Sequence, residues 1–449
     1  MDGNALAGRF TTGALLRFAV PNIGMMLFLA LYTIADGIFV SRLVGTLALS
    51  SLNMSWPLLG AELALAMMLS TGGSAVIARK QGAGQEQEAR EAFTFFLWAG
   101  TAVSVVLALV SLWQLDPILR FLGTSPEQMM DCMVYTRICL WFLPAMFLQI
   151  LFQTGFVTAG KPGLGLCVTV SGGLGNVVLD ALLMGPAHLG LAGAAVATGV
   201  SSLLPAAFGL LYFWRMRTGT LCLVPFHACW RMLWMACCNG LSELVSSWAN
   251  AATTFLCNLL LMAWWAEDGV AAITMVLYVQ YLFSAVFTGF SLGVAPVISY
   301  QYGTGDRRQL RSTVKRCIRF ILLCSLCVFL ATLAVIRPLL SLFAEPESTA
   351  YRITLQGFSW YAAAFLPMGL NIFAASLFTA LSNGRVSAGI SCCRTFLFPV
   401  CMLLLLPHLL GKWAVWLAIP AAEMLGLAVT VFCLHHWLER GFSQGFPQC

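Results

Sequence analysis

Five acidic residues lie within long apolar stretches of this sequence: Asp36, Glu62, Asp180, Glu243 and Glu423. An ionisable residue inside a membrane-spanning segment is costly and rare, and it usually faces a protein interior or a water-filled cavity where it serves function. Few basic residues lie at comparable depth to pair with these acids, and Arg394 is the main one. We therefore treat the five acids as candidates for a functional role, although Glu62 and Glu423 could instead lie in a wet cleft or pair structurally.

Asp180 follows Asn176 by four residues, which places both side chains on one face of a helix. A carboxylate, an amide carbonyl and a hydroxyl are the hard oxygen ligands that a small cation prefers. Asp36 and Thr198, in two other apolar segments, can complete such a site. Two carboxylates close together in a low dielectric need a cation or a proton between them, so the site would hold Na⁺ or take H⁺. The alternative is that these residues only join helices by hydrogen bonds.

The elements that position these residues are transmembrane helices. The 449 residues are 60% hydrophobic and 9% charged, with a mean hydropathy of +0.86, whereas a soluble chain carries roughly 25% charged residues. The apolar runs are unbroken rather than alternating, which favours helices of about 20 residues over barrel strands. We predict an all-α integral membrane protein of twelve spans, near 14–40, 47–70, 91–115, 131–157, 163–184, 190–214, 233–264, 270–298, 318–337, 353–381, 386–408 and 413–437.

Lys and Arg are unevenly divided between the loops on the two sides of these spans. With the N-terminus inside, eighteen lie on the cytoplasmic side and six on the other. Because cytoplasmic loops retain positive charge, we predict a multi-pass protein of the cytoplasmic (inner) membrane with both termini in the cytoplasm. The net charge of +6 then reflects topology and contact with the lipid bilayer, and not binding of nucleic acid.

The two halves of the chain resemble each other. GGSAVIARKQGAG at 72–84, after the second span, matches GVAPVISYQYGTG at 293–305, after the eighth, at an offset of 221 residues. Short interfacial turns also favour Gly, but the matching order of the flanking residues favours duplication. Six spans per half give both halves the same orientation, with a substrate path between them. We predict an N-terminal lobe at 1–218 and a C-terminal lobe at 219–449.

On these features the sequence resembles the multidrug and toxic compound extrusion (MATE) family. The residues that carry the resemblance are PNIGMMLFLALYTIADGIFVSRLVG (21–45), the stretch at 72–84, GNVVLDALL (175–183), GLAGAAVATG (190–199) and GVAPVISYQYGTGD (293–306). The resemblance implies two six-helix lobes in a V, which open alternately to either side. It also implies a monomer that exports amphipathic, often cationic drugs and toxins by antiport against Na⁺ or H⁺. The PVISYxYG form is similar to the bacterial branch that includes the staphylococcal-type exporters.

The resemblance also assigns the cation site. Asp36, Asn176, Asp180 and Thr198 match, position by position, the N-lobe cation site of the family, which makes them the predicted Na⁺ or H⁺ ligands. Pro21 interrupts the hydrogen bonding of the first span and predicts a kink. In relatives this helix bends as the lobe changes state, whereas the alternative here is a static kink.

Glu243 is the corresponding acid of the second lobe and a possible second coupling site. Some branches of the family pair it with an acid on the tenth span, where this chain has Asn371 instead, and that departure weakens a C-lobe cation site. Candidates for the wall of a substrate cavity are Tyr135, Gln153, Met25, Met275, Tyr278 and Tyr281. Met and aromatic side chains suit an adaptable apolar pocket, although each can equally serve packing.

Two further alternatives remain beside export of drugs. A flippase of lipid-linked precursors shares the two-lobe design but tends to have a cationic cavity, whereas the deep charges here are mostly acidic; a narrow-substrate metabolite exporter is the other. A membrane enzyme would need a catalytic cluster, and the five scattered His residues offer none. Without a GxxxxGK[ST] motif, coupling to ATP within the chain is not expected. We expect no cofactor apart from the coupling ion.

Overall fold

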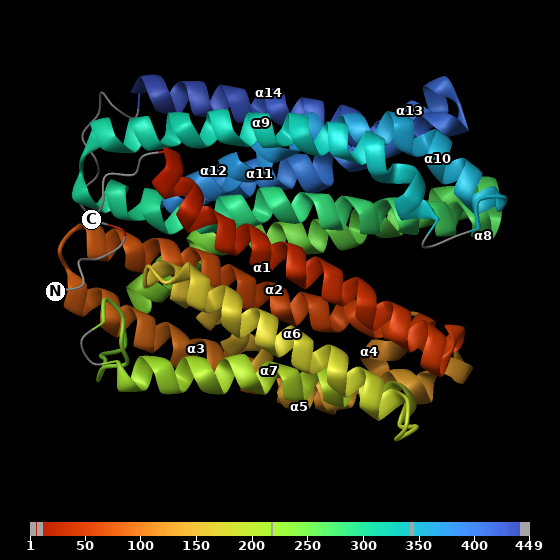
Figure 1. Cartoon of the computed structure of the whole chain (residues 1–449), viewed down its shortest axis with the longest axis horizontal. Helices are drawn as coiled ribbons and strands as arrows, with labels where there is room; N and C mark the ends of the chain where they lie inside the picture. The colour runs from red at the N-terminus through yellow and green to blue at the C-terminus, as the bar shows by residue number, and fades with distance from the viewer. Residues whose placement is uncertain (1–5, 7–11, 217–218, 342–344, 441–449) are drawn as a thin grey trace.

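The computed structural model of the chain describes residue 6 and residues 12–216, 219–341 and 345–440, and all its regular elements in these ranges are helices (Figure 1). The elements are, in order, α1 (Thr12–Phe39), the π-helical η1 (Val40–Val44), α2 (Thr46–Gly82), α3 (Glu86–Trp113), α4 (Leu115–Phe121), α5 (Pro126–Thr158), α6 (Pro162–Met184), α7 (Gly190–Arg215), α8 (Trp230–Thr304), α9 (Arg307–Leu340), α10 (Thr349–Tyr361), the 3-10 helix η2 (Ala362–Ala364), α11 (Phe365–Ala380), α12 (Gly384–Cys392), the π-helical η3 (Cys393–Leu397), α13 (Phe398–Leu410), the 3-10 helix η4 (Lys412–Ala414) and α14 (Val415–Arg440). The all-α prediction is confirmed.

Eleven helical stretches in the described ranges are long and apolar enough to cross a membrane. One of them, α8, has 75 residues and would measure about 110 Å if straight, against an apolar bilayer core of about 30 Å. Its backbone leaves the helical conformation at Ala266, with φ 49° and ψ −139°, so α8 comprises two spans, 230–265 and 267–304. The predicted spans 233–264 and 270–298 are these two limbs, and twelve spans result.

The second predicted span is too short. The sequence predicts an end near 70, whereas α2 continues to Gly82 and includes the sequence GGSAVIARKQG. Gly, Arg and Lys suggested a loop because they lower hydropathy, but helix propensity alone does not end a helix that is packed on both sides. This stretch is largely buried in the structure, and it packs against α8.

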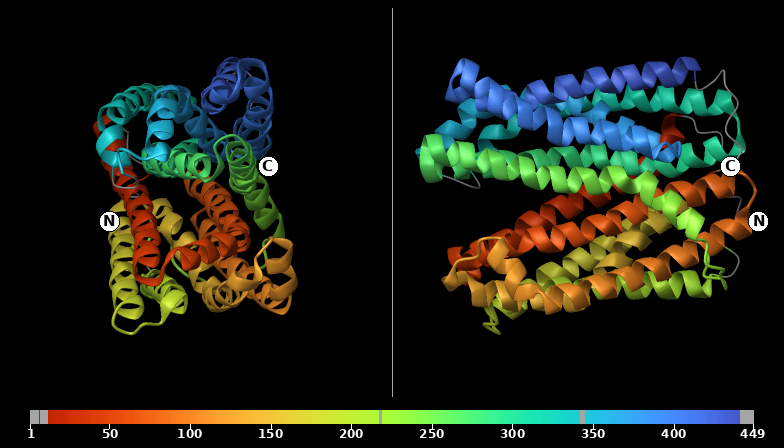
Figure 2. Two further views of the ribbon diagram at one scale, coloured as in Figure 1. Left: turned by 90° about the vertical axis from the view of Figure 1, so that its right-hand side faces the viewer. Right: turned by 180° about the vertical axis from the view of Figure 1, so that it is seen from behind.

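The helices form two bundles, an N-terminal lobe (α1–α7) and a C-terminal lobe (α8–α14), which lie side by side in Figure 2. Each bundle has its own buried apolar side chains. The lobes meet where α1 and α2 pack against α8, close to the end of the molecule that carries both termini, and they diverge toward the opposite end (Figure 1). The exact boundary after residue 218 stays a prediction, and residues 217–218 lie outside the described part.

The internal repeat is visible in the backbone. Gly84 and Gly305, which correspond at the offset of 221 residues, both take a left-handed conformation, with φ of +77° and +75°. Both follow the end of a long helix, α2 and α8 respectively. Only Gly adopts this conformation without strain, so the matched glycines end equivalent helices in the two lobes.

Two further matched glycines, Gly82 and Gly303, allow the backbones of the two lobes to approach closely. A methyl group on Gly82 would overlap the carbonyl oxygen of Tyr300 on α8. A methyl group on Gly303 would overlap the carbonyl oxygen of Arg79 on α2. The last turns of α2 and the second limb of α8 therefore touch backbone to backbone, and this glycine seam (Gly82 and Gly303) closes the lobes at the termini end.

Candidate cation site and central cavity

Asp36 on α1 and Asp180 on α6 lie together inside the N-terminal lobe. The two helices pack against each other, and the carboxyl groups are close enough to share a hydrogen bond when one of them carries a proton. Asp180 is fully buried. Both helices are rich in apolar residues around these positions, so the acids lie in a low-dielectric interior where a second bare charge is costly.

Asn176 and Thr198 adjoin this pair. Asn176 lies one turn before Asp180 on α6, is 2% exposed, and its Nδ2 donates to Oγ1 of Thr198 on α7 at 3.5 Å. This bond turns the amide nitrogen toward α7. The structure thus brings together all four residues that the sequence predicts for the cation site.

Several oxygens of this group lack hydrogen-bond partners within the described part of the chain. They are buried atoms: Oδ1 of Asp36, Oδ1 of Asn176, and Oδ1 and Oδ2 of Asp180. An unpaired buried oxygen costs about 1–3 kcal/mol, so four in one place call for a cation or a proton. Two carboxylates, an amide oxygen and a hydroxyl fit the oxygen coordination of Na⁺.

Tyrosines surround the acid pair. Tyr32 on α1, Tyr135 on α5 and Tyr278 on α8 all lie within electrostatic range of Asp36. Tyr278 comes from the other lobe, and its hydroxyl approaches Gly37 of α1. The predicted cavity residues Tyr135 and Tyr278 therefore adjoin the cation site rather than the central cavity described below.

A cavity between the lobes contains about 660 Å³ of empty space, its open mouth included. Met25 and Gln153, two of the predicted cavity residues, line it together with Glu243. Gln153 is held by a hydrogen bond of 3.0 Å from its Nε2 to Oγ1 of Thr169. The lining combines soft apolar side chains with one carboxylate, which suits an amphipathic cation.

Asn22 on α1 also lines this cavity and was not predicted. It is 1% exposed, and neither atom of its amide has a hydrogen-bond partner among the described residues. A polar residue directly after Pro21 in an apolar span was the signal available in the sequence. The helix α1 continues through Pro21 without a break, so the proposed bending at this proline stays a prediction.

The remaining candidates lie elsewhere. Met275 is buried in the apolar core of the C-terminal lobe, whereas Tyr281 is 48% exposed. Glu62 on α2 accepts a hydrogen bond of 2.6 Å from Oγ of Ser111 on α3, within the N-terminal lobe.

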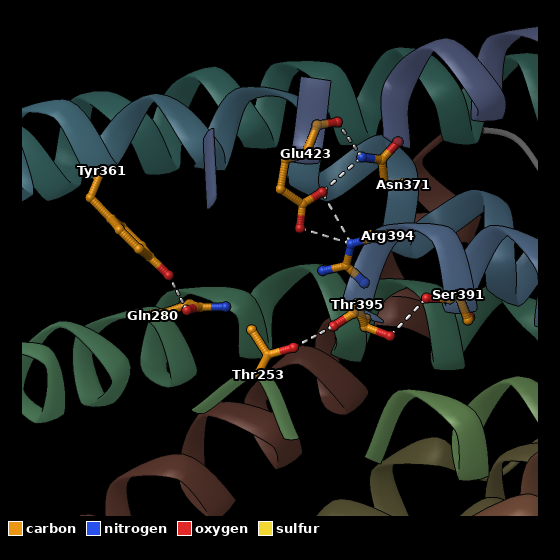
Figure 3. A network of polar contacts seen from close by, with 8 residues as sticks. All are labelled: Thr253, Gln280, Tyr361, Asn371, Ser391, Arg394, Thr395 and Glu423. Atoms are coloured by element: carbon orange, nitrogen blue, oxygen red, sulfur yellow. Dashed lines mark hydrogen bonds and ion pairs between the residues drawn. The ribbon is translucent and has the colours of Figure 1, made fainter. Parts of the chain in front are cut away.

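The C-terminal lobe contains a polar network that sequence reasoning did not assemble (Figure 3). Glu423 on α14 accepts hydrogen bonds from Nε of Arg394, at 2.9 and 3.1 Å. It also accepts one of 2.7 Å from Nδ2 of Asn371 on α11. The sequence drew attention to each of these residues separately, but only the packing of three spans places them in contact.

This arrangement of twelve spans in two lobes, with a polar site in one lobe and a cavity between them, defines a membrane transporter. The family model MatE matches residues 21–182 and 240–403, one stretch in each lobe. The chain therefore belongs to the MATE family, and it is a transporter and not an enzyme. Transporters of this family need no cofactor.

Relatives and solved structures agree. The chain is 23% identical to "Multidrug export protein MepA" of Staphylococcus haemolyticus over 67% of each chain. It is 25% identical to "FAD transporter" of Shewanella oneidensis over 92% of this chain and 91% of that one. A structure described as "Outward-facing conformation of a multidrug resistance MATE family transporter of the MOP superfamily" superposes with a TM-score of 0.93 at 21% identity, covering 99% of both chains. That likeness establishes the fold.

Proposed function

We propose that this protein exports amphipathic, cationic small molecules such as drugs and toxins, by antiport against Na⁺ or H⁺. The observation that carries the proposal is the set of unpartnered oxygens on Asp36, Asn176 and Asp180. Such a group is stable when it holds a cation or a proton and unstable when empty and fully ionised. An ion that enters from outside down its gradient supplies this stabilisation and favours the conformation that releases the substrate.

Substrate and ion occupy different places in this account. The ion binds within the N-terminal lobe at Asp36 and Asp180, whereas the substrate occupies the cavity between the lobes, beside Glu243 and Met25. Coupling follows because α1 contributes to both: it carries Asp36 and also lines the cavity with Asn22 and Met25. A change of packing around Asp36 therefore acts on the cavity wall.

The orientation is part of the proposal. Seventeen of the Lys and Arg residues, without the mid-span Arg394, belong to the loops and helix ends on the side of the termini. We assign this side to the cytoplasm of a cell with this protein in its inner membrane. The glycine seam then closes the cytoplasmic side, and the lobes diverge toward the outside. We expect a monomer, because each chain contains both lobes and the path between them.

A narrow-substrate exporter is the second candidate, favoured by the likeness to the FAD transporter over nearly the whole chain. FAD carries a pyrophosphate, which a protein binds with Arg, Lys or helix N-termini. The described residues that line the cavity include Glu243 and no Lys or Arg. The charge of the cavity thus supports a cationic substrate over FAD and over a lipid-linked pyrophosphate.

Efflux of ethidium from cells that express the chain tests the proposal, with external Na⁺ and pH varied independently. We expect efflux that follows one ion gradient and that Asp36→Asn abolishes at equal expression. Without efflux of ethidium or other cationic dyes by well-inserted protein, the multidrug proposal fails. Efflux of FAD by the same cells would then identify the narrow exporter.

A further inference from the structure

Arg394 and Glu423 form an ion pair in the middle of the C-terminal lobe. Arg394 lies ten residues into the span Gly384–Leu410, and Glu423 lies eleven residues into the span Lys412–Glu439. Their side chains are 14% and 5% exposed. Asn371 adds a second contact of 2.9 Å, from its Nδ2 to the backbone carbonyl of Glu423, so both oxygens of this carboxylate and its carbonyl are satisfied.

The backbone around Arg394 is built to present this side chain. Arg394 belongs to the π-helical turn η3, and such turns occur mostly as single-turn bulges inside α-helices, frequently at functional sites. Oγ1 of Thr253 on α8 donates to the carbonyl of Thr395 at 2.9 Å, which ties η3 to α8 (Figure 3). On α14, one turn after Glu423, Gly426 adjoins this network, because a methyl group there would lie 3.2 Å from Nδ2 of Asn371 and in ordinary contact, at 3.6 Å, with Cβ of Arg394.

The guanidinium also acts on a second carboxylate. Nε of Arg394 faces Glu423, whereas its two terminal nitrogens point away from it (Figure 3). Glu243, in the first limb of α8, lies within electrostatic range of Arg394. Glu243 and Glu423 therefore both lie near the positive charge of Arg394. In the N-terminal lobe, by contrast, Oδ1 of Asp36 and both carboxylate oxygens of Asp180 have no hydrogen-bond partner among the described residues.

We propose that Arg394 is a resident cation of the C-terminal lobe. It supplies to Glu423 the positive charge that an exchangeable ion supplies to Asp36 and Asp180 in the N-terminal lobe. Glu423 has its hydrogen bonds from Arg394 and Asn371, so it neither binds nor releases a coupling ion. Glu243 keeps a partly compensated charge at the cavity wall, where it serves the substrate. The consequence for coupling rests on the proposed function: ion exchange is confined to the N-terminal lobe.

Labelling with dicyclohexylcarbodiimide tests the resident cation, because this apolar reagent reacts with protonated carboxyl groups inside membranes. Purified full-length protein in detergent is treated across a pH series, and labelled peptides are quantified by mass spectrometry. An adjacent positive charge favours the ionised carboxylate by a factor of about 10 or more. We therefore expect Glu423 to label at least about tenfold more slowly than Asp180 in the wild type, and at least about tenfold faster in Arg394→Met than in the wild type.

Three variants serve as controls. Arg394→Lys keeps the charge and should keep Glu423 protected, whereas Arg394→Met/Glu423→Gln removes both charges and monitors folding. In Glu423→Gln the guanidinium of Arg394 has Glu243 as its remaining carboxylate, so labelling of Glu243 should be slower than in the wild type. If Arg394→Met does not fold, the labelling rate of Glu243 in this variant tests the proposal. Labelling of wild-type Glu423 as fast as Asp180, or an unlabelled Glu423 in folded Arg394→Met, overturns the proposal.

The experiment needs no transport, so its outcome is separate from that of the efflux assay. The expected labelling pattern in a protein without ion-driven efflux would retain Arg394 as a resident cation and reject the proposed function. Ion-driven efflux combined with rapid labelling of wild-type Glu423 would retain the proposed function and reject Arg394 as a resident cation.

Discussion

The carboxyl groups of Asp36 and Asp180 adjoin each other across α1 and α6, and no basic side chain of the described chain bonds to either. Glu423, in the other lobe, is paired with Arg394 at 2.9 Å. The two lobes share one fold but treat their buried acids differently. In the proposed function the pair Asp36 and Asp180 takes an ion from outside, whereas Glu423 has a positive charge of the protein, Arg394, as its partner.

Asn176→Ala separates Na⁺ from H⁺ as the ion at Asp36 and Asp180. The substitution removes an oxygen ligand, so a Na⁺ site should need about tenfold more ion for half-maximal efflux, equivalent to about 1.4 kcal/mol. A proton needs only the carboxylates, so a proton-driven carrier should keep its pH dependence. Efflux by the variant and by the wild type, measured over a series of Na⁺ concentrations and a series of pH values, distinguishes the two cases. An equal effect on both dependences would indicate that Asn176 only joins α6 to α7.

Glu243→Gln should weaken binding of a cationic dye by about tenfold, or about 1.4 kcal/mol, because it removes the one carboxylate on the cavity wall. The ion dependence of efflux should stay at the wild-type value, since Glu243 lies outside the N-terminal lobe. Dye fluorescence with purified protein measures the affinity. A neutral amphipathic dye is the control, and an equal loss for both dyes contradicts the electrostatic role.

Gly303→Val should prevent the lobes from closing along the glycine seam. The added side chain would overlap the carbonyl oxygen of Arg79, so export should be lost while the protein remains in the membrane. Gly389→Val is the matched control, because Gly389 is exposed on α12 with no heavy atom within 4 Å of a Cβ. Dye efflux at equal expression compares them. Full activity of Gly303→Val would contradict the prediction that the lobes must close along the glycine seam during transport.

Both termini should lie in the cytoplasm. Fusions of green fluorescent protein to the C-terminus should fluoresce, and fusions of alkaline phosphatase to the same end should be inactive, because each reporter works on one side of the inner membrane only. A phosphatase fusion after residue 266, at the turn between the two limbs of α8, should be active. The opposite pattern would place the termini, and with them the glycine seam, on the external side of the membrane.

The fold and the grouping of the four candidate cation ligands could be predicted from the sequence for separate reasons. The spans could be predicted because apolar segments of this length are stable only in a lipid bilayer. The candidate cation ligands could be predicted because they match the family pattern, and they are Asp36, Asn176, Asp180 and Thr198. The end of α2 was predicted wrongly because Gly72, Arg79 and Lys80 lower hydropathy. Their helical conformation depends on packing against α8, which comes from a distant part of the chain.

The C-lobe network was beyond sequence reasoning for a different reason. Asn371, Arg394 and Glu423 lie on three spans with no shared spacing, so no periodicity connects them. They meet beside the π-helical turn at Cys393–Leu397 and beside Gly426, where a methyl group would lie 3.2 Å from Nδ2 of Asn371. Both features are consequences of packing. A mid-span Arg with a mid-span Glu was the only signal available.

Transport by purified protein in liposomes is a direct test of ion-driven export through Asp36 and Asp180. A Na⁺ or H⁺ gradient is imposed with no ATP present, and movement of ethidium is followed for the wild type and for Asp180→Asn, with Glu62→Gln as a control acid in the same lobe. We expect one gradient to drive the dye in the wild type and in Glu62→Gln, and Asp180→Asn to abolish the movement. Gradient-driven transport that persists in Asp180→Asn would contradict the account.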